Sequence, residues 1–242
     1  MKLERTPVGV QVLAPAGPVL IRHVIGIGKN YADHAKEQGA AVPERPVLFT
    51  KNPLSASLTG DDIVIPPICQ DREQVDFEAE LAFLIAPPTP GVPIRDVPIE
   101  RAFEFVLGYC CANDVSARWW QKEGSGGQFN RGKSFDTFCP IGPELIPARD
   151  VPDPQNLRVR CEVNGVEMQN ASTREMIFPV ARLVHELTRG TTLLPGTLVL
   201  TGTPSGVGMA RTPPVWLKAG DRVTVAIETL GSITNTVRLG KA

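Results

Sequence analysis

The sequence predicts an α+β fold made mainly of β-strands, and three features of the 242-residue chain point to it. Its 23 prolines and 22 glycines divide the chain into short segments and discourage long helices. Many of these segments are short apolar or alternating runs, which are typical of strands. The few helical segments do not alternate strictly with the strands, so a doubly wound parallel sheet is not expected.

The first elements are a buried strand at 24–27 and a helix over the segment NYADHAKEQ at 30–38. Asn30 is a favourable N-cap, and Gly39 is the usual kind of residue after a helix end. This short helix therefore follows directly on the first strand.

The middle of the chain alternates between loops and strands. The strand candidates lie at 47–49, 63–65, 75–86 and 106–112. The segment 75–86 is the longest, and its second half is continuously apolar, which favours a strand in the middle of a sheet. Short helices are expected at 99–105, 116–122 and 179–189.

The C-terminal part contains the strongest hairpin signal. Asn164-Gly165 separates the strand candidates 157–163 and 166–169, and Asn-Gly is the preferred pair for a two-residue turn. Two further strands are expected at 198–201 and 222–228. We expect one catalytic domain over 1–242, with a core at about 24–237.

Composition argues against several classes of protein. The formal net charge is −1, which does not favour binding to nucleic acid. No apolar run is long enough to span a membrane, and the N-terminus lacks the pattern of a signal peptide. The five cysteines form no CxxC pair, which favours reduced thiols. A cytoplasmic location is expected, and a removed transit segment would leave a mitochondrial one open.

Three acidic residues alternate with two apolar residues in the segment Asp76-Phe77-Glu78-Ala79-Glu80. On a strand these side chains share one face, so the three carboxylates point the same way. A solvent-facing strand edge would tolerate them. The apolar run LAFLI that follows favours a central strand instead, where like charges are costly without a cation. We therefore predict a site for Mg²⁺, Mn²⁺ or Ca²⁺, which two glutamates share more readily than all three acids.

Asp114 is the candidate for a third ligand because it follows the apolar strand VLGYCCAN, and strand ends often display site residues. It could equally be the N-cap of the helix at 116–122.

His34 and Glu37 share one side of the first helix, being three residues apart. Such a pair is either an ordinary surface contact or a general base whose carboxylate orients the imidazole. The other histidines are His23 and His185, and the latter lies on an amphipathic helix and is interpreted as structural.

The segment Gly127–Ser134 matches the phosphate-binding pattern GxxxxGK[ST]. That loop requires a preceding strand and a following helix. Here a helical segment precedes it and the proline-containing FDTFCPIGP follows, so we do not expect a nucleotide there. Lys133 remains of interest as a cation in a glycine-framed segment.

Nine segments together resemble the fumarylacetoacetate hydrolase family, in its form without a separate N-terminal domain. They are, in order, GKNYADHAKE, RPVLFTKNP, VDFEAELAFLI, LGYCCANDVSAR, GKSFDTFCPIGP, DPQNLRVRCEVNG, STREMIF, LLPGTLVLTGTPSGVG and LKAGDRVTVAIETLG. Their number, order and spacing make the resemblance specific over about 24–237. It is strongest for the branch that includes oxaloacetate-handling and acylpyruvate-handling members.

The resemblance implies a role for each candidate residue. Glu78, Glu80 and Asp114 match the ligands of Mg²⁺ or Mn²⁺, and Asp76 matches a position that need not bind the metal. Lys133 matches a lysine that holds or polarises the substrate.

Two further groups of residues gain a role from the resemblance. His34 and Glu37 match a catalytic pair on a mobile helical lid that activates water. Substrate contacts are implied for Lys29, Arg118, Gln121 and Thr203, with Lys29 at a variable position able to meet a carboxylate. Trp119-Trp120 depart from the family pattern, in which an acid often follows the arginine.

The resemblance further implies a mixed β-sandwich roll with few helices and a homodimer. The implied activity is metal-dependent cleavage of a C–C bond in a small 2-oxo acid through a metal-bound enolate. Hydrolysis of an acylpyruvate or fumarylpyruvate is the leading hypothesis. Oxaloacetate decarboxylation or keto–enol tautomerisation is the alternative, and a non-catalytic dicarboxylate-binding protein is the alternative of another class.

Overall fold

A curled seven-stranded sheet forms the centre of the molecule. The computed structural model describes residues 1–37, 39, 41–87 and 89–241. In sheet order the strands are β5 (Val47–Lys51), β4 (His23–Gly28), β15 (Thr197–Leu200), β9 (Ala79–Ile85), β10 (Val106–Asn113), β12 (Cys139–Pro147) and β6 (Ala56–Leu58). The pairs β4/β15 and β6/β12 are parallel and the others antiparallel, so the sheet is mixed.

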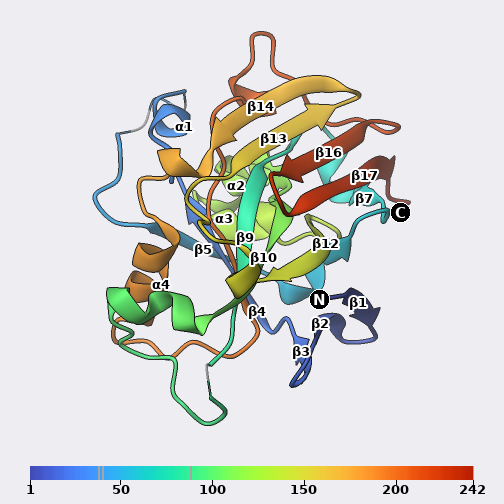
Figure 1. The fold of residues 1–242 in the computed structure, drawn as a ribbon. Coiled ribbons are helices and arrows are strands. Elements are labelled where there is room, and N and C mark those ends of the chain that lie inside the picture. Colours follow the sequence, from blue (N-terminus) through green and yellow to red (C-terminus); the bar gives the residue numbers. More distant parts are fainter. Residues whose placement is uncertain (38, 40, 88, 242) are drawn as a thin grey trace.

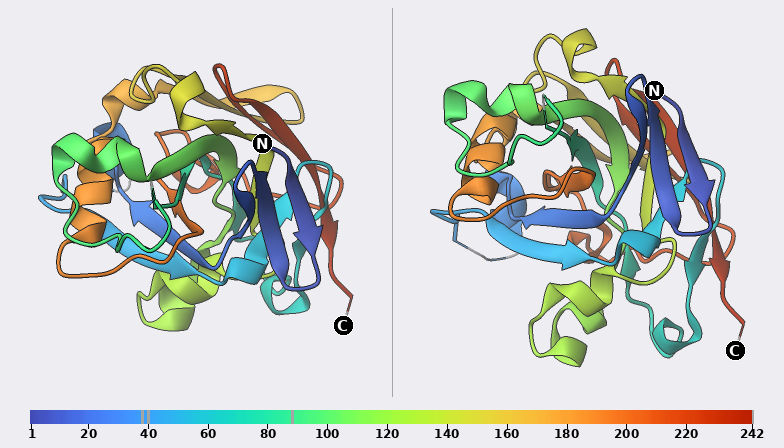
Figure 2. Two further views of the ribbon diagram at one scale, coloured as in Figure 1. Left: turned by 60° about the horizontal axis from the view of Figure 1, so that its bottom comes forward. Right: turned by 90° about the horizontal axis from the view of Figure 1, so that it is seen from below.

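The curl of this sheet follows from its connectivity. Strands β5 and β6 lie at opposite edges, yet only residues 52–55 separate them in the chain. Four residues cannot span a flat sheet of this width, given a strand spacing of about 4.8 Å. The sheet therefore rolls up until its two edges come together (Figure 2).

A five-stranded sheet packs against the outside of this roll (Figure 1). Its strands, in sheet order, are β14 (Val166–Ser172), β13 (Arg158–Val163), β16 (Arg222–Ile227), β17 (Gly231–Leu239) and β7 (Ile63–Ile65). Two smaller sheets complete the strands: β1 (Leu3–Thr6), β2 (Gly9–Ala14) and β3 (Gly17–Leu20) form one, and β8 (Val75–Asp76) and β11 (Ser116–Ala117) the other.

The helices are short. They are α1 (Ala32–Glu37), α2 (Arg118–Gln121), α3 (Phe129–Lys133) and α4 (Val180–Thr188), with a longer 3₁₀ segment at Ile99–Phe105. Helices α2 and α3 lie together at one end of the molecule (Figure 2). The predicted fold class, mainly β with a few short helices, is confirmed. No helix in the described part of the chain is long and apolar enough to cross a bilayer.

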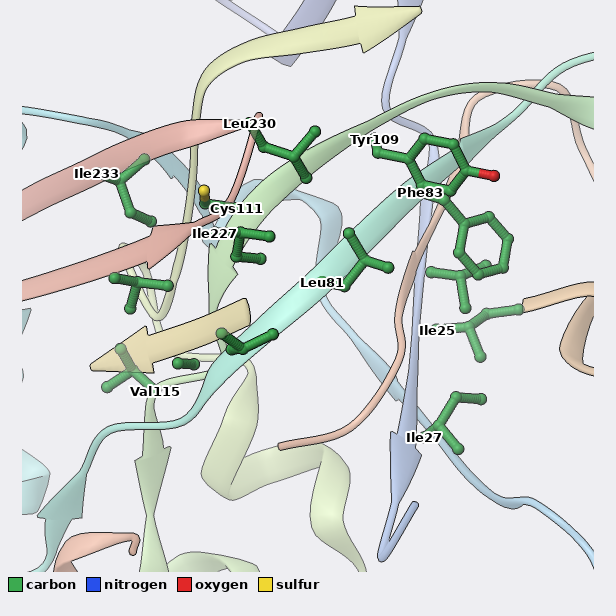
Figure 3. Close-up of a cluster of buried hydrophobic side chains, with 14 of the residues drawn as sticks. Ile25, Ile27, Leu81, Phe83, Tyr109, Cys111, Val115, Ile227, Leu230 and Ile233 are labelled. Atoms are coloured by element: carbon green, nitrogen blue, oxygen red, sulfur yellow. The ribbon is translucent and has the colours of Figure 1, made fainter. Parts of the chain in front are cut away.

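The two faces of strand β9 contribute to two separate hydrophobic clusters. Leu81 and Phe83 lie in the larger one, between the roll and the five-stranded sheet, where Figure 3 shows them near Tyr109 and Ile227. Ala82 and Leu84 belong to the smaller one, together with residues of β1 and β2. Because both faces are covered, every residue of β9 is buried. This confirms that the apolar run after the alternating acids is a central strand.

Most of the expected strands are present with small shifts at their ends. The Asn164-Gly165 hairpin is confirmed, since both residues have the positive φ angles (54° and 79°) that a type I′ turn requires. The segment 75–86 is not one strand, however, because it breaks at Phe77-Glu78 into β8 and β9. The helix expected at 116–122 begins only at Arg118, after the short strand β11.

Asn30 does not cap a helix, contrary to expectation. Helix α1 begins at Ala32 and its described part ends at Glu37, and the expected helix end at Gln38 lies outside the described residues. The buried Asn30 amide instead donates to the carbonyls of Phe178 (3.1 Å) and Thr201 (2.7 Å). It therefore ties the segment before α1 to the end of β15.

Phe83 offers a test of the packing between the roll and the five-stranded sheet. It is fully buried, so we expect Phe83→Ala to lower the free energy of unfolding by about 3–5 kcal/mol. Phe103 is 47% exposed, and Phe103→Ala should cost about 0.5 kcal/mol or less. Urea unfolding of both variants measures the difference, and equal losses would contradict this assignment of the core.

Candidate metal centre

Antiparallel pairing brings the three predicted metal ligands together. Residue Glu80 of β9 lies opposite Ala112 of β10, so the start of β9 is beside the end of β10. The backbone N–H of Asp114 donates to the carbonyl of Glu78 (2.9 Å), which continues the pairing beyond the two strands. Ligands that are 34 to 36 positions apart in sequence therefore meet at one end of the roll.

The geometry of Glu78, Glu80 and Asp114 suits a single cation. One carboxylate oxygen from each residue lies within 4.8 Å of the others, and all three side chains are buried. Three carboxylate oxygens form a hard donor set, which suits Mg²⁺ or Mn²⁺. Asp114 does not cap a helix, because α2 begins four residues later.

Buried cations hold these carboxylates in place. The Lys133 ammonium contacts Glu78 Oε2 at 2.7 Å and Asp114 Oδ2 at 2.6 Å, and it also donates to Ser116 Oγ. Arg118 Nη1 contacts the other oxygen of Glu78 at 2.8 Å. Both oxygens of Glu78 are thus fixed by a positive charge.

Lys51 is a member of the site that sequence reasoning missed. The residue is 2% exposed, and its ammonium binds Asp114 Oδ1 and the carbonyl of Phe138 (2.9 Å). The signal lay in RPVLFTKNP, one of the segments that resemble the family, but no charge pattern near Lys51 marked it. Only the curl of the sheet brings the end of β5 to Asp114.

The buried charges of the site leave an excess of negative charge. Among the described residues, the buried carboxylates are Asp76, Glu78, Glu80 and Asp114, and the buried lysines and arginines are Lys51, Arg118 and Lys133. Burial raises the pKa of Glu80 well above its ordinary value, and the charges of Asp114 and Glu78 raise it further. Burial opposes ionisation of Glu78 as well, but Lys133 and Arg118 lower its pKa below the ordinary range. A divalent cation would relieve the repulsion on Glu80, so the residues fit a metal ion.

Asp76 plays a different part from the two glutamates. Its carboxylate pairs with Arg118 Nε (2.8 Å) and accepts hydrogen bonds from the backbone N–H groups of Phe77, Gly208 and Met209. The break between β8 and β9 turns it away from the face of Glu78 and Glu80. Asp76 therefore anchors Arg118, which in turn holds Glu78.

The loop after β15 forms one side of the site. The backbone N–H of Gly202 donates to Glu80 Oε2 at 2.7 Å. The Thr203 hydroxyl donates to the carbonyl of Ala79 and accepts from Gln169 Nε2 (2.7 Å). A Cβ at Gly202 would lie 2.7 Å from Asn30 Cβ, and its φ of 95° also favours glycine. The loop therefore passes close to the segment before α1.

His34 and Glu37 form a hydrogen-bonded pair on helix α1. His34 Nδ1 lies 2.6 Å from Glu37 Oε1, and the imidazole is buried. The second oxygen of Glu37 accepts the N–H of Gly206 at 2.9 Å. The pair is thus not an exposed surface contact, because the loop after β15 holds its carboxylate.

Most of the other candidate site residues line one cleft. Its lining consists of Ile27, Gly28, Lys29, His34, Phe49, Glu78, Glu80, Gln121, Phe129, Lys133 and Thr203. Arg118 lies behind Glu78 and donates to Gln121 Oε1 at 2.9 Å, so it acts on the cleft through its neighbours. Lys29, Gln121 and Thr203 thus share one cleft with Glu78 and Glu80.

The glycine-framed segment at 127–134 does not form a nucleotide-binding loop. Helix α3 lies inside the segment and ends at Lys133, where such a loop requires a helix to begin. Lys133 points to the carboxylates instead, as its contacts with Glu78 and Asp114 require.

Comparison with known families identifies the chain. Residues 23–238 match the family profile described as the fumarylacetoacetate (FAA) hydrolase C-terminal domain. The chain belongs to the fumarylacetoacetate hydrolase family. The resemblance seen in the sequence is thereby confirmed.

Named relatives and solved structures agree with this assignment. A mitochondrial oxaloacetate tautomerase of Xenopus laevis is 46% identical over 214 residues, which cover 88% of this chain and 65% of that protein. The chain thus spans somewhat less than two-thirds of that relative. The fumarylacetoacetate hydrolase of Exiguobacterium antarcticum is 42% identical, with a TM-score of 0.80 over 96% of this chain and 78% of that one.

A third structure bears on the metal. The fumarylpyruvate hydrolase of Pseudomonas aeruginosa, solved with Mn²⁺ and pyruvate, is 30% identical with a TM-score of 0.82. The alignment covers 99% of this chain and all of that one. A divalent metal site is therefore supported both by a relative and by the acidic cluster of this chain.

Trp119 and Trp120, which depart from the family pattern, pack outside the carboxylate cluster. The guanidinium of Arg72 lies 4.4 Å from the centre of the Trp119 ring. Trp120 packs edge-on against Phe135 with ring centres 6.5 Å apart. The tryptophans thus brace the helix that carries Arg118 and Gln121.

Glu80→Gln tests the metal centre, because the amide keeps the shape of the side chain and an acceptor for Gly202. We expect the affinity for Mn²⁺ to fall about a hundredfold or more, since loss of a ligand should exceed the 10–100-fold cost of losing a ligand's partner. Titration calorimetry with Mn²⁺ measures this affinity.

Two comparisons make the test specific. Glu73 is exposed and pairs with Lys218 at 2.9 Å, so Glu73→Gln should bind Mn²⁺ as the parent does. Without metal, Glu80→Gln removes one of the mutually repelling carboxylates and should not lower the thermal midpoint. An unchanged Mn²⁺ affinity in Glu80→Gln would rule out this residue as a ligand.

Proposed function

We propose that this protein is a divalent-metal-dependent tautomerase that interconverts the keto and enol forms of oxaloacetate or a closely related 2-oxo acid. The observation that carries the proposal is one cleft containing two of the buried carboxylates, Lys133 and the imidazole of His34. The cleft thus combines a site for a cation with a group able to transfer protons. The named oxaloacetate tautomerase among the relatives supports this choice of reaction.

The ligands of the metal would be Glu78, Glu80 and Asp114. Mg²⁺ or Mn²⁺ bound there would supply a Lewis acid for the oxygen atoms of a 2-oxo acid. Lys133 and Thr203 line the same cleft. The Lys133 ammonium, which already binds Glu78, Asp114 and Ser116, would add positive charge beside the substrate's carboxylate and keto oxygen. Gln121, whose amide oxygen is held by Arg118, adds a donor from its amide nitrogen.

The proton transfer is assigned to His34. Conversion of the keto form requires removal of a proton from C3 and addition of one to the keto oxygen, with no net change in composition. Glu37 accepts a hydrogen bond from Nδ1 of His34, which fixes the orientation of the ring. The burial of His34 excludes bulk water from this step.

A second reaction is favoured by a separate observation. The Mn²⁺- and pyruvate-containing relative is a fumarylpyruvate hydrolase with the same fold over the whole chain. Hydrolysis of an acylpyruvate needs one additional element, a water molecule that His34 deprotonates for attack on the distal carbonyl. The same residues can serve both reactions, and the hydrolase is therefore the second candidate.

One set of assays separates these functions. The protein is incubated with Mg²⁺ or Mn²⁺ and the enol form of oxaloacetate, and the loss of enol absorbance is followed alongside the release of pyruvate. We expect ketonisation well above that produced by the metal alone, abolished by EDTA, with little pyruvate released. Pyruvate formed in step with enol loss would indicate decarboxylation, and pyruvate from fumarylpyruvate or acetylpyruvate would indicate hydrolysis. Activity that survives EDTA would exclude the proposed mechanism.

Substitution of His34 tests the proton transfer. We expect His34→Ala to lower kcat for tautomerisation about 10²–10⁴-fold, the usual contribution of a positioned acid or base. Glu37→Gln keeps an acceptor for Gly206 but loses the carboxylate charge beside the imidazole, so a smaller loss is expected.

His185 provides the matched control for this test. It lies on α4 and its Nδ1 contacts the carbonyl of Val97 at 2.8 Å, away from the cleft. His185→Ala should leave turnover per folded molecule unchanged. Full tautomerase activity in His34→Ala would place the proton transfer on another group.

A further inference from the structure

We infer that Gln169 is a positioning residue, which fixes the loop after β15 relative to the metal ligands. It lies on β14, at the edge of the five-stranded sheet, whereas the ligands lie at one end of the roll. Gln169 is 1% exposed, and its hydrogen bonds go to Ala79, Thr203 and Pro204 rather than to the carboxylates. The effect of Gln169 on turnover rests on the proposed function, whereas its effects on the loop and on metal affinity do not.

The first argument concerns the break between β8 and β9. A buried backbone N–H that finds no partner in a neighbouring strand must find one elsewhere. Three consecutive N–H groups at the break, those of Phe77, Glu78 and Ala79, bind side-chain oxygens. The acceptors are, in order, Asp76 Oδ1 (2.9 Å), Asn113 Oδ1 (3.0 Å) and Gln169 Oε1 (2.9 Å). Because Ala79 lies between the two glutamate ligands, Gln169 holds the backbone from which both project.

The second argument is that Gln169, Thr203 and Ala79 close a triangle of hydrogen bonds. Gln169 Nε2 donates to Thr203 Oγ1 at 2.7 Å, and the Thr203 hydroxyl donates to the Ala79 carbonyl at 2.9 Å. Gln169 Nε2 also donates to the Pro204 carbonyl at 2.9 Å. The amide thus uses one acceptor and two donors at once, a combination that neither an apolar side chain nor a carboxylate can supply.

The third argument concerns the groups that the loop holds. It binds the ligand Glu80 through the N–H of Gly202, and it binds Glu37, the partner of the candidate base, through the N–H of Gly206. The two residues that the Gln169 amide holds lie between these glycines in the chain. Displacement of this stretch would therefore disturb one metal ligand and also the imidazole that Glu37 orients.

The edge of β14 is suited to receive the loop, because an edge strand has backbone groups without a neighbouring strand. The Arg211 guanidinium binds the carbonyls of Met168 and Gly206. A Cβ at Gly206 would lie 2.3 Å from the Met168 carbonyl oxygen, so the loop passes directly against the strand. Met168 and Gln169 thus both hold the loop, and Gln169 in addition reaches β9.

Three variants separate this role from general packing. Gln169→Met keeps the length of the side chain but makes none of its hydrogen bonds. Asn113→Ala removes the neighbouring acceptor at the break, that of the Glu78 N–H, and among the described residues no hydrogen bond joins Asn113 to the loop. Val159→Ala removes a fully buried side chain from the same interface between the sheets, so it controls for lost stability.

Three measurements are made on each variant. Calorimetry gives the Mn²⁺ affinity. Amide hydrogen exchange, followed by mass spectrometry on the metal-free protein, reports the opening of the loop at 202–206. Loss of the oxaloacetate enol at saturating Mn²⁺ gives kcat and KM, and thermal melting shows how far each variant is destabilised.

The expected result for Gln169→Met is a combined loss. Mn²⁺ binding should weaken about 10–100-fold, the usual cost of losing a group that orients a ligand. The amides at 202–206 should exchange about tenfold faster or more, because the loop opens locally. The kcat should fall with little change in KM, since the imidazole rather than the bound substrate is displaced.

The two comparison variants should behave differently. Asn113→Ala should weaken Mn²⁺ binding through Glu78 but leave exchange in the loop as it is in the parent. Val159→Ala should lower the thermal midpoint and leave both the Mn²⁺ affinity and the exchange at 202–206 unchanged.

The inference is overturned if Gln169→Met folds and matches the parent in loop exchange or in Mn²⁺ affinity. It is also overturned if Val159→Ala or Asn113→Ala accelerates exchange at 202–206 to the same extent. If Gln169→Met does not fold, Thr203→Val decides, because it removes the loop's side of the triangle and leaves β14 intact. Faster exchange at 202–206 in Thr203→Val supports the inference, and unchanged exchange overturns it.

Failure of the proposed function is a separate result. If the parent does not turn over oxaloacetate, the reaction is reassigned, and the exchange and Mn²⁺ measurements still decide the role of Gln169.

Discussion

The structure depends on burying four carboxylates, those of Asp76, Glu78, Glu80 and Asp114, close to one another. Their mutual repulsion must be offset by neighbouring positive charges. Removing a charge from water costs several kcal/mol, and that cost is offset only when partners with good geometry surround it. Here Lys51 and Lys133 take the two oxygens of Asp114, and Arg118 joins Asp76 to Glu78. Glu80 is the exception, since its hydrogen-bond partner among the described residues is a neutral backbone N–H, that of Gly202. This imbalance makes the site a binding site for a cation rather than a closed ionic cluster.

The fold supplies these partners from segments that are far apart in sequence. Rolling the seven-stranded sheet brings the end of β5, with Lys51, to the end of β10, with Asp114. Antiparallel pairing of β9 and β10 aligns the glutamates with Asp114. The loop after β15 then closes the site by binding Glu80 through Gly202 and Glu37 through Gly206. A shift of one residue in the β9 register would turn Glu80 to the opposite face and dismantle the site.

The parts of the structure that the sequence predicted are those with a local signal. Alternating acids before an apolar run indicated Glu78 and Glu80, and Asn164-Gly165 indicated a hairpin. The residues whose roles were not predicted correctly have partners that are distant in sequence. Asn30 looked like an N-cap, but its amide is used by Phe178 and Thr201, about 150 and 170 positions away. No local pattern indicated that Lys51 is buried, because its partners Asp114 and Phe138 lie just after β10 and just before β12.

Glu37 links the position of helix α1 to the state of the catalytic candidate His34. One of its oxygens binds the imidazole and the other binds the N–H of Gly206. Movement of α1 away from the loop would therefore break the Gly206 contact and carry the imidazole away from the cleft together with its carboxylate. In tautomerisation the imidazole needs only to exchange protons with the substrate, whereas in hydrolysis it must also hold a water molecule. Under the proposed function, we expect the choice between the two reactions to depend on how much room α1 leaves above the carboxylate cluster when Glu37 is bound to Gly206.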